Sequence, residues 1–279
     1  MDISVIIPTC NRNDFLIRCL DSIAPPIQTI DPDCYEVIVT DDSKHNSAKP
    51  LFEEKYTWAK WVEGPKRGPA SNRNNGARHA VGKWLVFLDD DCLPVKEILK
   101  NYIAIIEKNS GIDVFEGKVE QEGRRKSHFD YAPCNGITGG VLLSCNFCIR
   151  KDLFDKLNGF DENFKYPHME DFDLKERIDA TGKTILFVTE AKVIHPWRKV
   201  VDGIKLGKYA EMTIYFNAKH GIDSNLLRLL KPLAVVYWSL VKRSLFSSDI
   251  FTAIKITIGH AGVIVLNFHK WKKKYAKLQ

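Results

Sequence analysis

The sequence predicts an α/β fold followed by a C-terminal helical appendage, and three observations support this. Over the first 110 residues, short apolar runs alternate with helix-period stretches, which indicates parallel strands joined by right-handed helical crossovers. A more irregular second half follows, up to about residue 200. Beyond Trp197 the chain carries long apolar stretches interspersed with Lys and Arg. We therefore expect a main domain over residues 1–200, made of halves 1–110 and 111–200, and an appendage over residues 201–279.

The first half opens with a strand, a helix and a second strand. Ile3–Ile7 is a short apolar run typical of a buried strand, and Pro8 stops it. A helix is expected over Asn13–Ile23, where the apolar positions at helical spacing are Phe15, Leu16, Cys19, Leu20 and Ile23. Asn11 and Asn13 are the two candidates for its N-cap, and a Pro-Pro pair ends it. The apolar run Tyr35–Val39 predicts the second strand.

Two more strands and two helices complete the first half. A short strand is expected over Trp58–Val62, and a loop rich in glycine, asparagine and arginine over Gly64–Gly76, which enters a helix through Ala80. The continuous apolar run at residues 84–88 predicts a fully buried strand. A helix follows from about Val95 to Lys108, with apolar positions Ile98, Tyr102, Ile105 and Ile106.

The later segments alternate less regularly. In the second half we expect a strand over Val114–Val119, helices over Lys151–Leu157 and Asp171–Thr181, and a strand over Ile185–Val188 that ends near His195. In the appendage we expect helical stretches over Ile204–Lys219, Leu226–Leu245 and Ile250–Phe268. The last reaches the lower length limit for crossing a bilayer, but Lys255 and His260 within it weaken that interpretation.

Charge is divided unevenly along the chain, whose net charge is +6. Residues 1–191 contain 25 Lys and Arg against 31 Asp and Glu, a net −6, and residues 192–279 contain 16 against 4, a net +12. Near the terminus, Trp271 and Tyr275 lie among lysines, a mixture that suits a membrane interface. We therefore expect the C-terminal segment to make peripheral contact with an anionic membrane. Packing on the main domain or on a second copy, in a homo-oligomer, is the alternative.

Cysteine usage favours a reducing compartment. The seven cysteines are scattered, odd in number and mostly in apolar contexts, and no signal-peptide pattern precedes the first strand. These features fit a cytoplasmic protein, whose membrane contact would be at the inner face of the cell membrane. The lone C-x-x-C of Cys145 and Cys148 lacks the second pair that a structural zinc site needs.

The triplet Asp89-Asp90-Asp91 directly follows the buried strand at residues 84–88. Three adjacent carboxylates repel one another unless a positive group lies beside them. Mg²⁺ and Mn²⁺ prefer carboxylate and phosphate oxygens, and open α/β sheets bind ligands beyond the carboxyl ends of their strands. The triplet therefore predicts a divalent-cation site. The alternative is a solvated loop start or a helix N-cap cluster, because Pro94 follows and a helical pattern begins near Val95.

Six segments in the expected order resemble the family 2 glycosyltransferases with the GT-A fold, over roughly residues 3–197. The first four are Val5–Arg12, Asp41–Ser43, Gly68–Gly76 and Asp89–Asp91. The fifth combines Asn146–Arg150 with Gly159–Glu162, and the sixth is Glu170–Leu174 with Arg177. His195-Pro196-Trp197 follows these six. The resemblance implies a GT-A-type nucleotide-binding mixed sheet flanked by helices, with a nucleotide-binding half and an acceptor half. It also implies inverting transfer of a sugar, from a UDP-sugar or a similar donor, to a hydroxyl of a glycan or lipid-linked acceptor in cell-envelope polysaccharide synthesis.

The resemblance assigns roles to individual residues. The nucleotide-binding candidates are Pro8, Thr9, Asn11, Arg12, Asp42, Arg73, Asp89 and Asp90. The candidate metal ligands are Asp91, Asp89 and His195, and the ion is Mn²⁺ or Mg²⁺. Asp171 is the candidate general base. Two departures leave the nucleotide open, because a serine follows Asp42 where many members have glycine, and a cysteine follows Asp91 where another acid is frequent.

Sugar transfer requires a stabilised diphosphate leaving group and removal of a proton from the attacking hydroxyl. A divalent cation supplies the first as a Lewis acid, and a carboxylate within hydrogen-bond reach supplies the second. From spacing alone, helix capping is the favoured role of Asp171, because acidic residues stabilise a helix N-terminus. The resemblance reverses that preference. A structural role for His195 and a surface charge at Arg73 are likewise the alternatives to ligand contact.

Two other functions compete with glycosyl transfer. A sugar-nucleotide nucleotidyltransferase would need a G-x-G-x-R loop after the first strand, where this chain has Pro8-Thr9-Cys10-Asn11-Arg12. An inactive relative that binds a glycan or scaffolds a membrane complex is the non-enzyme alternative, against which the intact Asp91 and Asp171 argue. Nucleic acid is not among the expected partners.

Overall fold

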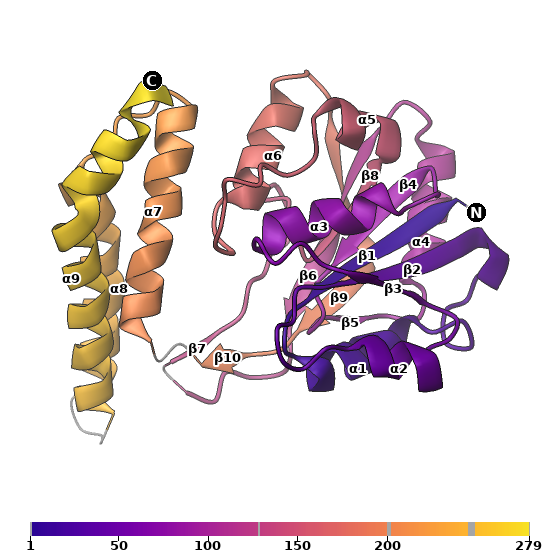
Figure 1. The fold of residues 1–279 in the computed structure, drawn as a ribbon, viewed down its shortest axis with the longest axis horizontal. Helices are drawn as coiled ribbons and strands as arrows, with labels where there is room; N and C mark the ends of the chain where they lie inside the picture. Colours follow the sequence, from indigo (N-terminus) through magenta and orange to yellow (C-terminus); the bar gives the residue numbers. More distant parts are fainter. Residues whose placement is uncertain (1, 128, 200–201, 245–248, 279) are drawn as a thin grey trace. The chain divides into compact units, whose positions relative to one another are not determined.

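Figure 1 shows the computed structural model of the chain, which describes residues 2–127, 129–199, 202–244 and 249–278. The chain forms two compact units. The sheet unit comprises Met1–Glu122, Ala132–Lys165 and Glu170–Pro196, and the helical unit comprises Gly123–Tyr131, Tyr166–Met169 and Trp197–Gln279. Two short internal segments thus belong with the C-terminal helices. The expected boundary at residue 200 lies outside the described residues.

The sheet unit is built on one eight-stranded mixed sheet, which confirms the α/β prediction. Its strands lie in the order β3 (Lys60–Glu63), β2 (Tyr35–Asp41), β1 (Ile3–Thr9), β4 (Trp84–Leu88), β8 (Asn146–Arg150), β6 (Val114–Gln121), β9 (Ile185–His195) and β5 (Leu93–Pro94). The first four are parallel, whereas β8 is antiparallel to both β4 and β6. The parallel strands all end at one edge of the sheet, so the segments that follow them meet there.

Helices cover both faces of the sheet (Figure 1). They are α1 (Asn13–Ile23), α2 (Lys49–Glu54), α3 (Pro69–Arg78), α4 (Ile98–Lys108), α5 (Lys151–Lys156) and α6 (Glu170–Asp179). Alternate residues of β1 serve the two faces: Val5 and Ile7 join the core under α1, while Ile6 faces α3. A Cβ added at Gly76 of α3 would lie 2.5 Å from the Ile6 side chain, so the glycine allows this close approach.

Several local predictions need correction. The N-cap of α1 is Arg12, not an asparagine, and Phe15 is exposed rather than in the core. Asn11 instead has φ 55°, and its side-chain oxygen accepts hydrogen bonds from the backbone of the loop after β2. Strand β1 runs through Pro8 to Thr9, because the fixed φ of proline is compatible with extended backbone.

The glycine-rich segment is mostly helical rather than a loop. Helix α3 begins at Pro69, which is favoured in the first helical turn, directly after Gly68 at φ 106°. Helix α4 begins at Ile98 instead of Val95, since the preceding residues form β5 and pair with β9. The short helix α2 has no counterpart among the predictions.

Over its described residues, the helical unit contains three long helices, which are α7 (Gly203–Lys219), α8 (Leu226–Ser244) and α9 (Ile250–Tyr275). A two-stranded ribbon of β7 (Asp130–Tyr131) and β10 (Arg198–Lys199) joins them, and a 3-10 turn follows at Ala276–Leu278. The expected helix end at Leu245 lies outside the described residues. Helices α7 and α9 approach closely, because a Cβ at Gly207 would lie 2.6 Å from Val263. Apolar residues form the clusters between the helices.

Candidate active site

Two of the three aspartates after β4 are buried and contact a cation from the chain itself. Asp90 and Asp91 are almost completely buried, and the Arg12 guanidinium forms ion pairs with both. The Arg12 Nε donates to Asp90 Oδ2 at 3.2 Å, and the Thr9 hydroxyl donates to the same oxygen at 2.7 Å. Burial, reinforced by Asp91 and opposed by Arg12, raises the pKa of Asp90 to about 7. The positive group that the triplet requires is therefore partly supplied by Arg12.

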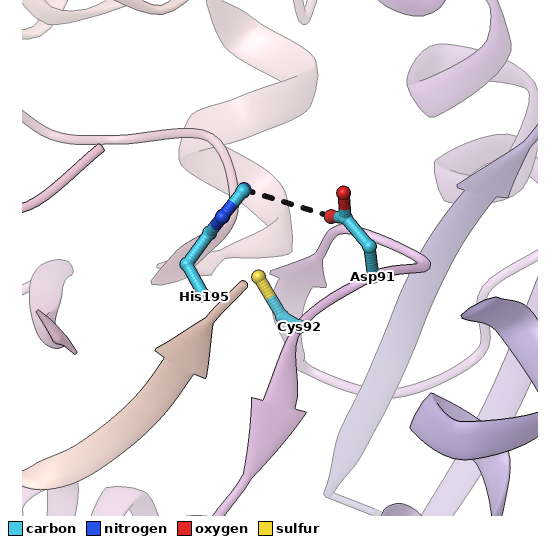
Figure 2. Close-up of side chains that lie close together, drawn as sticks. All are labelled: Asp91, Cys92 and His195. Atoms are coloured by element: carbon cyan, nitrogen blue, oxygen red, sulfur yellow. Dashed lines mark ion pairs between the residues drawn. The ribbon is translucent and has the colours of Figure 1, made fainter. Parts of the chain in front are cut away.

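Asp91 also faces His195, the last residue of β9, as Figure 2 shows. Nε2 of His195 lies 3.6 Å from Asp91 Oδ1. Nδ1 lies 2.8 Å from the Pro196 carbonyl oxygen, which can only accept a hydrogen bond, so in a neutral ring Nε2 presents its lone pair to Asp91. Two electron-pair donors that face one another in this way suit a bound cation.

Cys92 completes this group of three possible metal ligands. Its sulfur, one Asp91 oxygen and one His195 nitrogen all lie within 4.8 Å of one another. Burial raises the pKa of the Cys92 thiol well above its usual value, which favours the neutral thiol. Because Mg²⁺ and Mn²⁺ are hard cations that do not favour sulfur, the oxygen of Asp91 and the nitrogen of His195 are the donors that suit them.

Asp89 points to a different partner. Its Oδ1 lies 2.7 Å from Nη2 of Arg73, and Nη1 of Arg73 lies 3.1 Å from Glu170 Oε1. Arg73 is buried in α3 with its guanidinium 5.6 Å from the Phe160 ring centroid. Burial alone would lower the pKa of Arg73, but the two carboxylates raise it above its ordinary value. Arg73 therefore connects the triplet to the start of α6.

Helix α6 begins with Glu170 and Asp171. Glu170 is buried, and burial with the neighbouring Asp171 raises its pKa to about 7 against the opposing effect of Arg73. Asp171 is partly exposed. Its oxygens accept from the backbone N–H of Phe172 at 2.9 Å and of Ser144 at 3.4 Å. Burial raises the pKa of Asp171, while Arg73 and these N–H groups lower it.

The turn after β1 packs against the turn after β2. The Asn11 N–H donates to the Ser43 hydroxyl at 2.6 Å, and the Asp42 N–H donates to the Thr9 carbonyl at 2.9 Å. Asp42 Oδ1 accepts from the Lys66 N–H at 2.7 Å, and burial raises the pKa of this carboxyl despite that bond. The Asp41 carboxylate has partners in the part of the chain after it: it accepts hydrogen bonds from the Ser47 hydroxyl, the Ala48 N–H and the Trp61 indole N–H.

The predicted site residues therefore gather at the carboxyl edge of the parallel strands. Pro8 and Thr9 lie in β1, Asn11 and Arg12 follow it, and Asp42 follows β2. The sequence did not assign a site role to Glu170 or Cys92. Their burial and their contacts with Arg73 and with Asp91 and His195, respectively, are visible only in the folded chain. Of the expected acceptor-side segments, Asn146–Arg150 is the buried strand β8, and Glu162 forms ion pairs with Arg67 and Arg78 beside α3.

The family model for glycosyl transferase family 2 matches residues 4–164, more than half of the chain. The chain belongs to glycosyl transferase family 2. This family assignment confirms the resemblance inferred from the motifs. The matched region includes the triplet Asp89–Asp91 and ends before helix α6.

Curated relatives support the same family. An uncharacterized glycosyltransferase of Haemophilus influenzae is 27% identical over 183 residues, which cover 61% of this chain and 60% of the relative. GalNAc(5)-diNAcBac-PP-undecaprenol beta-1,3-glucosyltransferase of Campylobacter jejuni is 31% identical over 139 residues, which cover 46% of this chain and 41% of the relative. The chain thus spans three fifths or less of the length of these relatives.

Solved structures share the fold. TarS of S. aureus, residues 1–349 with UDP-GlcNAc, matches with a TM-score of 0.60 and 18% identity, over 99% of this chain and 90% of that chain. The mannosyltransferase PcManGT of Pyrobaculum calidifontis, with GDP-Man and Mn²⁺, matches with a TM-score of 0.58 and 17% identity, over 99% and 84%. These similarities confirm the GT-A fold.

Proposed function

We propose that this family 2 glycosyltransferase moves a sugar, with inversion, from a nucleoside-diphosphate donor to a hydroxyl of a glycan or lipid-linked acceptor. The observation that carries the proposal is the chain of ion pairs from Asp89 through Arg73 to Glu170. It joins Asp89, after the end of β4, to helix α6, whose second residue is the proposed base, Asp171. One connected set of side chains can therefore hold a donor diphosphate and activate an acceptor.

On the donor side, the turn after β1 and the turn after β2 would hold the nucleotide. The Asp42 carboxylate would accept a hydrogen bond from an N–H of the nucleobase. The Arg12 guanidinium, which pairs with Asp90 and Asp91, would contact the phosphates. A UDP-sugar is the favoured donor, because TarS shares the fold and carries UDP-GlcNAc. A GDP-sugar is the alternative, since PcManGT carries GDP-Man.

On the acceptor side, Asp171 would act as the general base. The acceptor oxygen forms a bond to the anomeric carbon while the bond from that carbon to the diphosphate oxygen breaks, so the configuration inverts. The hydroxyl proton passes to the Asp171 carboxylate, and the electron pair of the broken bond leaves with the diphosphate. A carboxylate whose pKa burial raises is a better proton acceptor than a solvated one. The backbone N–H of Ser144 would keep this carboxylate oriented.

A divalent cation, Mn²⁺ or Mg²⁺, fits between Asp91 and His195. When bound, it would supply Lewis-acid stabilisation of the charge that develops on the diphosphate. Asp91 and His195 are the residues to hold it, whereas Asp89 is engaged with Arg73. Mn²⁺ is present in the PcManGT structure. Of the three ligands predicted from sequence, we therefore retain two for the metal and assign Asp89 to positioning Arg73.

The acceptor is proposed to be lipid-linked and presented at the cytoplasmic face of the cell membrane. The name of the C. jejuni relative describes transfer to an undecaprenol-linked glycan. The basic C-terminal segment is the part of this chain suited to such a surface.

A donor screen tests the proposal. UDP- and GDP-sugars are mixed with the purified full chain, with Mn²⁺ or with EDTA, and thermal unfolding and nucleotide release are measured. The true donor at a hundred times its Kd is expected to stabilise the fold by about 2.7 kcal/mol by mass action. Nucleotide release should require the metal and rise when the acceptor is added, and the product should have inverted anomeric configuration.

The competing functions give different results in the same screen. Stabilisation by glycans without any nucleotide release would identify an inactive glycan-binding relative. Formation of a nucleotide sugar from a sugar phosphate and a nucleoside triphosphate would identify a nucleotidyltransferase. Either result would overturn the proposal.

A further inference from the structure

One side of helix α9 is exposed and apolar over much of its length. The residues that form this apolar face are Phe251, Ile254, Ile258, Val265 and Leu266. The first four are separated by three, four and seven residues, and Leu266 lies eight residues after Ile258, so all five lie on one side of the helix. Phe251 is 79% exposed and Leu266 is 84% exposed. The opposite side of α9, which includes Ile256, Ile264 and Phe268, is buried in the clusters with α7 and α8.

Exposed lysines extend the same side of the helix. Lys255 lies among the apolar residues, and Lys270, Lys273 and Lys277 continue the three- and four-residue spacing beyond Leu266. Residues 251–266 span about 22 Å at 1.5 Å per residue. The face is therefore an apolar strip with a basic end, within a segment, residues 192–279, that carries a net charge of +12.

Length and composition alone would allow this helix to cross a bilayer. Among the described residues, Ile250–Leu278 is the helix long and apolar enough to do so, and only 17% of its most apolar stretch is buried. However, α9 packs along α7, whose Gly203 and Gly207 let the two helices approach closely. Helix α7 carries exposed Lys205 and Lys208. Immersing this helix pair in hydrocarbon would desolvate those charges, which is unfavourable.

We propose that the exposed side of α9 docks the protein in the plane of an anionic lipid bilayer. The apolar face enters the boundary between headgroups and acyl chains, and the lysines contact the anionic headgroups. Charge complementarity selects this occupant over a second copy of the chain, because two such basic faces would repel each other. The inference rests on the helical unit alone and is independent of the donor and acceptor proposed above.

Vesicle flotation of the full chain tests the proposal. On phosphatidylcholine vesicles that contain phosphatidylglycerol, the protein is expected to float at low salt, and to float less on pure phosphatidylcholine or at high salt. Phe251→Glu with Leu266→Glu should lower the bound fraction at least about tenfold. Lys270→Gln, Lys273→Gln and Lys277→Gln together should reduce the preference for anionic vesicles by about tenfold or more.

A matched control is Val81→Glu, an exposed apolar residue of the sheet unit, which should float like the wild type. Circular dichroism checks that each variant is folded, and Phe251→Trp provides a second readout through a blue shift of its fluorescence on vesicles.

Three results would overturn the proposal. The first is wild-type protein that stays soluble with anionic vesicles at low salt. The second is a wild-type dimer in sedimentation that Phe251→Glu with Leu266→Glu converts to monomer, which would assign the face to a second copy. The third is retention in the bilayer after alkaline carbonate extraction, which would indicate a spanning helix.

Discussion

The two units of this glycosyltransferase place their charges in opposite ways. In the sheet unit, Arg73, Asp90, Asp91, Glu170 and His195 are each at most 4% exposed and lie at one edge of the sheet. In the helical unit, the described clusters between helices are apolar, and Lys255, Lys270 and Lys273 lie on the exposed side of α9.

The sheet unit thus pairs charges in its interior, whereas the helical unit carries exposed lysines beside exposed apolar residues. A buried ion pair rarely adds stability, because desolvation offsets the attraction. The paired charges of the sheet unit are therefore the groups for which we propose a role in the reaction. Exposed lysines beside exposed apolar residues cost little and are suited to an external surface.

The largest effect is expected where buried charge faces the proposed cation. Asp91→Ala should abolish turnover and weaken metal-dependent nucleotide binding, because it removes the carboxylate between Arg12 and His195. Nucleotide release and the Mn²⁺-dependent thermal shift measure these losses. Asp33→Ala, at an exposed carboxylate, is the matched control. Full activity of Asp91→Ala, or wild-type turnover that EDTA does not change, would contradict the metal role.

Asp171 is expected to show the next largest effect. Asp171→Asn should lower kcat by about 10²-fold or more and leave donor binding nearly intact, as expected when a general base is lost. Single-turnover kinetics and donor titration measure the two quantities. Asp173→Asn, in the same helical turn and paired with Arg177, should mainly reduce stability. If Asp171→Asn instead reduces stability and binding together, capping of α6 is its role.

Arg73 offers a finer test, because its positive charge lowers the pKa of the proposed general base, Asp171. The base must be deprotonated, so kcat/KM rises with pH through the pKa of Asp171. Arg73 lowers that pKa, and Arg73→Gln should therefore move the acid limb of the profile to higher pH. Arg73→Lys retains the positive charge and should return the acid limb of the kcat/KM profile to its wild-type pH. A loss of activity at all pH values with an unmoved limb would indicate a structural role alone.

The smallest effect on activity is expected at a partly buried histidine of the helical unit, which lies outside the proposed site. His168 lies 2.9 Å from the Thr213 hydroxyl of α7, and burial, together with His260, lowers its pKa from 6.5 to about 4. As pH falls from 6.5 to 4, the unfolded state takes up the proton first, so stability is lost across this window. The loss approaches about 3 kcal/mol when complete.

His168→Gln keeps a polar partner for Thr213 and removes the titrating group. Hydrogen exchange in α7, compared at pH 7 and pH 5, is expected to show acid-induced opening in the wild type and a weaker response in the variant. An identical pH response in the two proteins would show that another group is responsible.

Local patterns were sufficient for much of the sheet unit. The strands β1, β2 and β4 are apolar runs because both of their faces are covered, and α1 shows its buried stripe of Leu16, Cys19, Leu20 and Ile23 in its spacing. The six-residue helix α2 is too short for a periodic signal. The start of α3 was misplaced because its composition of glycine, asparagine and arginine is typical of loops.

The sequence by itself determined the chemical character of the two regions. The acidic triplet at the end of a strand predicted a metal site, the family resemblance added the general-base role of Asp171, and a tail rich in lysine and apolar residues predicted a contact surface. The tertiary structure alone decided which cation each carboxylate contacts, because Arg12 meets Asp90 across 78 positions and Arg73 meets Glu170 across 97. It also decided which side of α9 is exposed. Pairing and burial depend on the packing of elements that are distant in the chain, and local sequence patterns do not encode that packing.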